Sequence, residues 1–159
     1  MNPIRIAAVF ISALALFSCV SVDDTAEIFK ISFDKNDAAA TGTMAQQEVT
    51  SGTTATLLKC TFTKTGWRFA GWAATADGAV TYADQAAYKM GNANTTLFAK
   101  WTINTNQVAF DKNDALASGS MNPQSIAYGA TAALTANAFS KTGCSFAGWA
   151  TNATGSIVY

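Results

Sequence analysis

Three segments of the chain carry the hydrophobic pattern of β-strands. Ile28–Phe33 places apolar side chains at every second position, with Lys30 and Ser32 on the opposite face. Thr95–Trp101 alternates in the same way, and Trp67–Trp72 is a short aromatic run that directly follows a Thr-Gly pair. A period of two and an enrichment in aromatic residues predict three strands.

The remaining elements are less sharply marked. Asp34–Asp37 consists of turn-forming residues that should end the first strand. Glu48–Gly52 is a weaker strand candidate that ends at a glycine, and Thr54–Leu58 fits either a strand or the start of a helix. Residues 83–90 are expected to hold a short helical turn. The pattern as a whole predicts small, sheet-dominated domains.

The strand pattern occurs twice at a constant spacing. Phe33–Ala38 recurs as Phe110–Ala115, and Phe69–Trp72 recurs as Phe146–Trp149, in both cases 77 positions later and without a gap. Roughly half of the positions aligned at this offset are identical. Such regular self-similarity indicates tandem duplication of a folded unit.

The duplication suggests a domain organisation. We expect a first repeat domain at residues 28–102, a linker at 103–109 and a second repeat domain at 110–159. The second repeat is expected to be truncated, because nothing in the sequence corresponds to Ala83–Thr102. A unit of about 75 residues buries only about 60% of its unfolded surface, so buried aromatic rings are expected to contribute much of its stability.

The N-terminus has the features of a targeting segment. Ile6–Phe17 is apolar apart from one serine, which is the length of a signal-peptide core and too short to span a bilayer. It leads into Leu16–Cys19, which resembles a bacterial lipobox. We therefore expect residues 1–18 to be a lipoprotein signal peptide, cleaved between Ser18 and Cys19, with Cys19 as the lipid anchor. An ordinary secretory signal and a retained membrane helix are the alternatives.

Residues 19–27 carry acidic but no basic side chains, and we expect them to form a short acidic tether. Several acyl chains on Cys19 would hold the protein at a membrane much more firmly than one. The residue directly after Cys19 is Val20, whereas an aspartate at this position would resemble an inner-membrane retention signal. The sequence therefore favours the outer membrane or cell surface of a bacterial cell envelope.

Composition narrows the functional classes. Half of the residues are apolar and only 13% are charged, with ten basic and ten acidic side chains. A zero net charge argues against a nucleic-acid partner, which would require clustered Lys and Arg. The chain has no histidine, which excludes Ser-His-Asp and Cys-His nucleophile systems and histidine metal sites. No catalytic residue, cofactor or metal site is expected.

The repeated motifs resemble the Listeria–Bacteroides repeat, the family of the internalin B-repeat. The specific parts are the Gly-x-x-Phe-x-Gly-Trp motifs at Gly66–Trp72 and Gly143–Trp149 and the terminal Leu-Phe-Ala-Lys-Trp at Leu97–Trp101. Trp67 and Cys144 depart mildly from the family, which usually has tyrosine there. The resemblance implies a β-rich α+β fold of tandem, small β-grasp-like domains, each with a mixed sheet and little helix. It also implies a spacer or binding module of bacterial surface proteins.

Two groups of polar and aromatic residues have competing interpretations. Asp34, Asn36 and Asp37 offer alternating oxygen ligands, but no bidentate glutamate follows, so a strand-ending turn is favoured over a cation site. The same holds for their copies Asp111, Asn113 and Asp114. The aromatic side chains could form a platform for a sugar or peptide, but identity between the copies favours a core role for most of them. We assign Phe69, Trp72 and Trp101 to the core and leave the exposure of Trp67 open.

Cys60 and Cys144 occupy non-equivalent positions in the two repeats, which excludes a repeated disulfide within each domain. A bridge between the repeats is one alternative in an oxidising compartment. Free, partly buried thiols are favoured. The role of the two cysteines stays open at this stage.

These observations favour a lipid-anchored bacterial surface protein with non-catalytic repeats that act in adhesion or interaction. The alternative is a structural spacer within a longer repeat array, without a ligand of its own. The expected partners are the membrane, through the lipid, and an unidentified host or cell-wall protein or glycan. Self-association through an edge strand of the second repeat is a further hypothesis.

Overall fold

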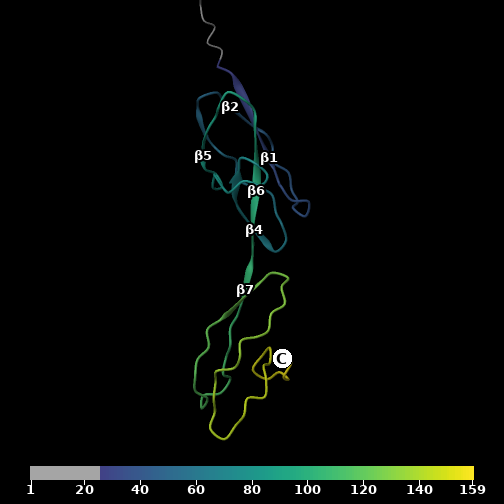
Figure 1. Ribbon diagram of the computed structural model, residues 1–159, viewed down its shortest axis with the longest axis vertical. Coiled ribbons are helices and arrows are strands. Elements are labelled where there is room, and N and C mark those ends of the chain that lie inside the picture. The colour runs from purple at the N-terminus through teal and green to yellow at the C-terminus, as the bar shows by residue number, and fades with distance from the viewer. Residues whose placement is uncertain (1–25) are drawn as a thin grey trace, which may run out of the picture.

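The computed structural model describes residues 26–159, which form two units arranged end to end (Figure 1). Over this range the chain consists of strands, turns and loops, without a helix. The strands are β1 (Ile28–Asp34), β2 (Gln47–Thr50), β3 (Thr54–Thr56), β4 (Trp67–Ala73), β5 (Ala87–Lys89), β6 (Thr95–Ile103), β7 (Thr105–Val108) and β8 (Gln124–Ala127). The fold is therefore β-rich, as the sequence predicts.

The first repeat is built on a mixed four-stranded sheet with the order β2-β1-β6-β4. β1 pairs with β2 in antiparallel orientation and with β6 in parallel orientation, while β4 runs antiparallel to β6. The three strands predicted most strongly from alternation are β1, β4 and β6. β6 is a central strand of this sheet, so it holds β1 and β4 together.

The expected helical turn at residues 83–90 is wrong. Residues Ala87–Lys89 form β5, which pairs with β3 in a second, two-stranded sheet in which Tyr88 lies opposite Ala55. Ala87 and Lys89 have little intrinsic strand preference, and the strand depends on its partner. The same pairing settles the ambiguous segment at Thr54–Leu58, whose first three residues are strand β3.

A single apolar core fills the first repeat. Trp72 is fully buried at its centre, and Phe33 and Phe69 pack against it with ring centroids 4.9 and 4.7 Å away. Trp101 is partly buried against the same cluster. The structure thus confirms the core assignment of Phe69, Trp72 and Trp101. The other buried large side chains of this cluster are Ile31, Val49, Leu57, Phe62, Met90 and Leu97.

A glycine allows the chain to close over this core. The β4–β6 register shifts between Phe69 and Gly71, and Gly71 has a φ of +140°. A Cβ atom at Gly71 would lie 2.6 Å from the carbonyl oxygen of Tyr82. Only glycine fits a bulge with this φ and such close backbone approach. The following residue, Trp72, donates its backbone N–H to the same Tyr82 oxygen at 2.8 Å.

The second repeat reproduces only part of this arrangement. β7 and β8 pair in the register of β1 and β2, with Thr105 opposite Ala127 where the first repeat has Ile28 opposite Thr50. The described residues contain no counterparts of β5 and β6 in this repeat. Residues 144–150, which correspond to β4, are not a strand because no neighbour pairs with them along their length.

The two repeats are joined more tightly than a linker at 103–109 would suggest. Only Asn104 separates β6 from β7, and its backbone N–H donates to the carbonyl of Gly66 at 2.9 Å. The carbonyl of Asn104 in turn accepts the backbone N–H of Tyr128 at 2.8 Å. The Tyr128 ring lies so close to Gly66 that a Cβ there would come within 1.9 Å of it. The junction is thus a packed contact between the repeats.

The expected signal peptide at residues 1–18, with Ser18 and Cys19 at its cleavage site, lies outside the described residues. The same is true of all but the last two residues of the expected tether at 19–27. Over residues 26–159, the structure has no helix with the length and hydropathy needed to cross a membrane. The assignment of the lipid anchor therefore rests on the sequence.

Candidate functional site

The polar turns at Asp34–Asp37 and at its copy are structural features. The Asp34 carboxylate accepts the backbone N–H of Asn36 at 2.6 Å, and the Asp37 carboxylate accepts that of Ala39 at 2.8 Å. Lys64 Nζ lies 2.5 Å from the other Asp37 oxygen. This hydrogen bond from Lys64, together with that from Ala39, lowers the pKa of Asp37. The carboxylates hold the turn, as predicted in preference to a cation site.

The second repeat repeats these contacts. Asp111 accepts the N–H of Asn113 at 2.6 Å, and Asp114 forms an ion pair with Lys141. The hydrogen bond between these two side chains lowers the pKa of Asp114 and raises that of Lys141. Among residues 26–159, no three His, Cys, Asp or Glu side chains are grouped as a metal site would require. Neither turn offers a free set of ligands.

Both cysteines of the described chain are free thiols, so the bridge between the repeats is not formed. Cys60 is partly buried, as expected, and this burial raises the pKa of its thiol. Cys144 is exposed, which differs from the expectation of a partly buried thiol. Trp67 is half-buried, and Lys64 Nζ lies 4.0 Å from the centroid of its ring, a cation–π contact.

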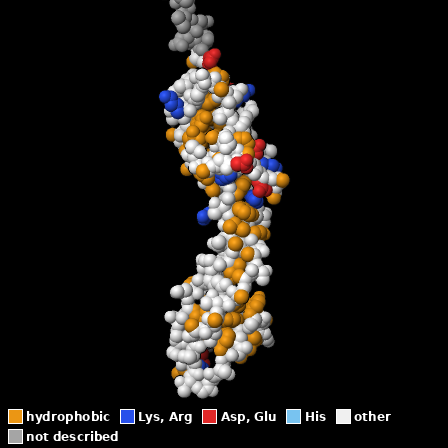
Figure 2. Space-filling view, viewed as in Figure 1, with side chains coloured by type: hydrophobic (Ala, Val, Ile, Leu, Met, Phe, Trp, Pro, Cys, Tyr) orange, Lys and Arg blue, Asp and Glu red, His pale blue; other side chains and the backbone are white. Residues whose placement is uncertain are grey.

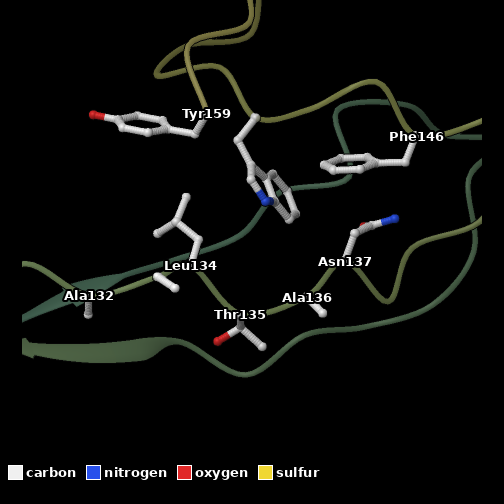
Figure 3. Close-up of a pocket in the computed structure, with 9 residues that line it drawn as sticks. Ala132, Leu134, Thr135, Ala136, Asn137, Phe146 and Tyr159 are labelled. Carbon is white, nitrogen blue, oxygen red and sulfur yellow. The ribbon is translucent and has the colours of Figure 1, made fainter.

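The strongest candidate site is an apolar groove in the second repeat, with a volume of about 450 Å³. Figure 3 shows Leu134 on one side of this groove, with Phe146 and Tyr159 on the other. None of the side chains that line it is charged. They are Ala132, Ala133, Leu134, Thr135, Ala136, Asn137, Phe146, Trp149 and Tyr159. Below, "the groove" refers to these nine residues.

One wall of the groove is fixed by a side chain that the sequence analysis did not select. Gln124, on β8, donates through Nε2 to the carbonyl of Ala133 at 2.7 Å and accepts the N–H of Thr135 at 2.8 Å. Gln47 makes the corresponding bonds to Thr56 and Leu58 in the first repeat. The constant offset of 77 positions would have identified this glutamine, because it is conserved between the two copies.

The opposite wall is formed by the Phe-Ala-Gly-Trp motif. Trp149 donates its N–H to the carbonyl of Tyr159 at 3.0 Å and accepts that of Val158 at 2.9 Å. Gly148 has a φ of +145°, and a Cβ there would meet the Tyr159 oxygen at 2.7 Å. The motif thus bends over Trp149 in the second repeat as it does over Trp72 in the first. The bend presents Phe146 and Trp149 to the groove.

The groove is an exposed apolar surface. Phe146 is 50% exposed and Tyr159 is 72% exposed, and Trp149 is only partly buried, whereas its counterpart Trp72 is completely buried. In the space-filling view, hydrophobic side chains gather on the face shown of the second repeat, and most charged groups lie on the first (Figure 2). An uncharged apolar groove is suited to binding another apolar surface. The side chains that line it include no histidine, cysteine, aspartate or glutamate.

The comparisons with known proteins agree with the repeat pattern. The family model of the Listeria-Bacteroides repeat domain matches residues 29–100 and again residues 107–159. Its two matches coincide with the two structural units and together span most of the chain. No curated protein and no solved structure matches the chain.

Proposed function

Because the chain belongs to the Listeria-Bacteroides repeat family, a family of bacterial surface proteins, we propose that it is a lipid-anchored adhesion or interaction module without catalytic activity. The observation that carries this proposal is the groove in the second repeat. Exposed apolar side chains that gather on one face are typical of interaction surfaces. The uncharged lining indicates a partner recognised by shape and apolar contact.

A non-catalytic role is supported by the chemistry of the chain. It has no histidine, and the carboxylates of Asp37 and Asp114 are engaged with lysines. General acid–base catalysis needs a group that can approach a substrate with a suitable pKa. The hydrogen bonds that hold each carboxylate in its turn lower its pKa, which moves it further from the range suited to proton transfer at neutral pH.

The anchor is proposed from the Leu16–Cys19 motif and the apolar segment before it. Acylation of Cys19 would place the protein at the outer membrane or cell surface of a bacterial envelope. The test is a Cys19→Ala variant, followed by fractionation of cells into membrane and soluble parts. We expect the variant to leave the membrane fraction. Unchanged membrane retention would overturn the anchor.

For the fold, we propose that each complete repeat is a β-grasp-like domain. The strand order β2-β1-β6-β4, with the first and last strands parallel at the centre, supports this assignment. The layer that would cover the sheet is formed by loops and the small β3–β5 sheet. Such a scaffold presents its edges and loops to solvent, where a partner can bind.

The interaction role is tested with the full chain on a surface. Beads coated with the chain are screened against host proteins, cell-wall proteins and glycans. We expect a ligand whose binding is lost in Phe146→Asp, because Phe146 lines the groove. The matched control is Leu116→Asp, since Leu116 is an exposed apolar side chain outside the groove. Equal loss in both variants, or no ligand at all, would contradict the proposal.

The second candidate function is a spacer, and the junction favours it. The long axes of the repeats continue into each other through β6, Asn104 and β7 (Figure 1). The contact of Tyr128 with Gly66 braces this connection. A rigid, end-to-end arrangement would hold a terminal domain away from the membrane. Lack of any groove-dependent ligand in the screen would favour this function over adhesion.

A further inference from the structure

The chain enters and leaves the first repeat through two strands that lie side by side. β1 is the first strand of this repeat and β6 is the last, and they pair in parallel, beginning with Ile31 opposite Thr95. β1 begins at one end of the repeat, and β6 leads out of the other end into β7 (Figure 1). In a parallel pair, the start of one strand and the end of the other lie at opposite ends. Tension on the chain therefore pulls β1 and β6 along their own axes, in opposite directions.

This direction of pulling loads the contacts between the two strands together. Sliding β1 past β6 strains every hydrogen bond of the pair at the same time, whereas lifting the strands apart from one end breaks the bonds one after another. Forced unfolding is governed by the rate of crossing the unfolding barrier. That barrier is higher when all of the bonds must break together, so the same pair resists more force in shear than in peeling.

Two side chains extend the contact beyond the last paired residues of β1 and β6. Trp101, on β6, donates its Nε1–H to the carbonyl of Lys35 at 3.0 Å. Asn36 donates through Nδ2 to the carbonyl of Ala99 at 3.2 Å and to that of Ala76 at 2.9 Å. Asn36 has a φ of 53°, a conformation that asparagine tolerates better than most residues. These bonds tie the turn after β1 to β6.

The other end of the pair and its middle are also secured. Asn94 Oδ1 accepts the backbone N–H of Lys30 at 2.8 Å, one position before the pairing of Ile31 with Thr95. In the middle of the pair, Ile31 is completely buried and Leu97 is 1% exposed. Hydrogen bonds in such a water-excluded setting are stronger than exposed ones. Water therefore cannot readily replace the bonds between the strands while they are under load.

We propose that the first repeat carries tension along its long axis and that β1 and β6 form a mechanical clamp. The clamp consists of the parallel pair and the side-chain bonds of Asn94, Asn36 and Trp101. Tension enters at Ile28 and leaves at Ile103, and it passes on through Asn104, whose backbone is hydrogen-bonded to both repeats. The inference goes beyond the proposed function and takes from it only the source of tension, a protein held at a membrane and bound to a partner.

The test pulls the full chain in two directions with optical tweezers. For shear, handles are coupled to azide-bearing amino acids at positions 27 and 104, one on each side of the first repeat. For peeling, the handles are at positions 27 and 93, which lie at the same end of the parallel pair because Ile31 is opposite Thr95. The second repeat lies outside both pulled segments. The side chains that are replaced, Glu27, Ala93 and Asn104, are all exposed.

We expect the rupture force in shear to be at least about twice that in peeling at the same loading rate. Because the protein differs only in where the handles are attached, a difference in force reports the direction of loading and not the stability of the fold. Equal forces in the two directions, or a lower force in shear, would overturn the proposal.

A variant at the far end of the pair tests which bonds share the load. Asn36→Gly removes the Nδ2 bonds and keeps a residue that adopts a positive φ. It should lower the rupture force in shear by at least about 15%. In peeling it should leave the force unchanged, because the far end is loaded only after the first contacts have broken.

The matched control is Gln47→Ala, which also removes two bonds between a side chain and the backbone. Those bonds join Gln47 to Thr56 and Leu58 and do not connect β1 with β6. The control should lower the urea midpoint but leave the rupture force in shear unchanged. An equal loss of shear force in both variants, or a loss from Asn36→Gly that is the same in both directions, would contradict the clamp.

The clamp and the proposed function can fail separately. If the rupture force depends on direction but the bead screen finds no ligand, the clamp stands and the adhesion role fails. If the screen finds a ligand that depends on Phe146 but the two directions give equal forces, adhesion stands and the clamp is overturned. Neither outcome depends on the lipid anchor.

Discussion

The pair Leu57 and Leu134 provides a direct test of how the two repeats differ, because one sequence position occurs in two environments. Leu57 is 1% exposed within the core that surrounds Trp72, whereas Leu134 lines the open groove. Truncation to alanine in a closed core costs the transfer free energy of the removed atoms and leaves a cavity. At the edge of an open groove, water fills the space and no enclosed cavity forms.

The magnitudes follow from these two environments. For Leu57→Ala we expect a loss of about 3 kcal/mol in the free energy of unfolding, within the usual 2–5 kcal/mol for a buried leucine. In a domain of this size, that loss lowers the melting temperature by roughly 12–24 °C. For Leu134→Ala we expect a smaller loss, about 1 kcal/mol, because the side chain is only partly buried and its removal leaves no closed cavity.

The assay is urea unfolding of the full chain followed by tryptophan fluorescence. Three of the four tryptophans, Trp67, Trp72 and Trp101, belong to the first repeat and dominate its signal. Leu57→Ala should shift that transition to lower urea, and Leu134→Ala should cause a smaller shift in the transition of the second repeat, which Trp149 reports. A shift of equal size in both variants, or a loss below about 1 kcal/mol in Leu57→Ala, would refute the closed-core and open-groove distinction.

Three further predictions concern the junction, a hydrogen bond and pH. Gly66→Ala should alter the relative orientation of the repeats, measured by residual dipolar couplings, because the added Cβ would collide with the Tyr128 ring. Gly143→Ala is the control and should leave the orientation unchanged, because Gly143 has a similar φ of +75° and nothing lies within 4 Å of the added Cβ. Equal changes in both variants would contradict the packed junction. Trp101→Phe should lower the free energy of unfolding of the first repeat by at least about 1 kcal/mol, because it removes the Nε1 hydrogen bond to the Lys35 carbonyl and part of a ring that packs against the core. An unchanged urea midpoint would show that neither contact contributes. Asp37 has a lowered pKa in the folded protein, so its stabilising contribution is present above the unfolded pKa of about 3.9 and is lost as the pH falls through the folded pKa. In urea titrations between pH 5 and pH 2, the wild type should therefore lose more stability than Asp37→Asn. Parallel curves for the two proteins would refute the role of this carboxylate.

Prediction from sequence succeeded where a local pattern and the duplication gave the same answer. β1, β4 and β6 were visible from their alternating or aromatic residues, and the core role of Trp72 followed from its presence in both copies. Asp37 was assigned to a turn for a local reason, since short polar side chains bond to the backbone beside them. These features depend mainly on residues close together in the chain.

Prediction failed where a partner strand decides the structure. Ala87–Lys89 was expected to be a helical turn, but β3 makes it a strand. Residues 144–150 share the Phe-Ala-Gly-Trp motif with β4, yet they form no strand, because within the described residues no counterpart of β6 pairs with them. The contact of Tyr128 with Gly66 could not be predicted either, because the first repeat has Ser51 at the position of Tyr128 and the duplication therefore gave no signal for it.

The sequence by itself determined that this protein contains two copies of one β-rich unit and that aromatic residues and glycines form its architecture. Strand periodicity and a constant offset are properties of the chain that need no knowledge of its neighbours. Only the tertiary structure decided that one copy of the Trp72 surface is closed and that its equivalent around Trp149 is open. The physical reason is that burial depends on what covers a side chain, and the covering segment lies far away along the chain from the surface that it protects.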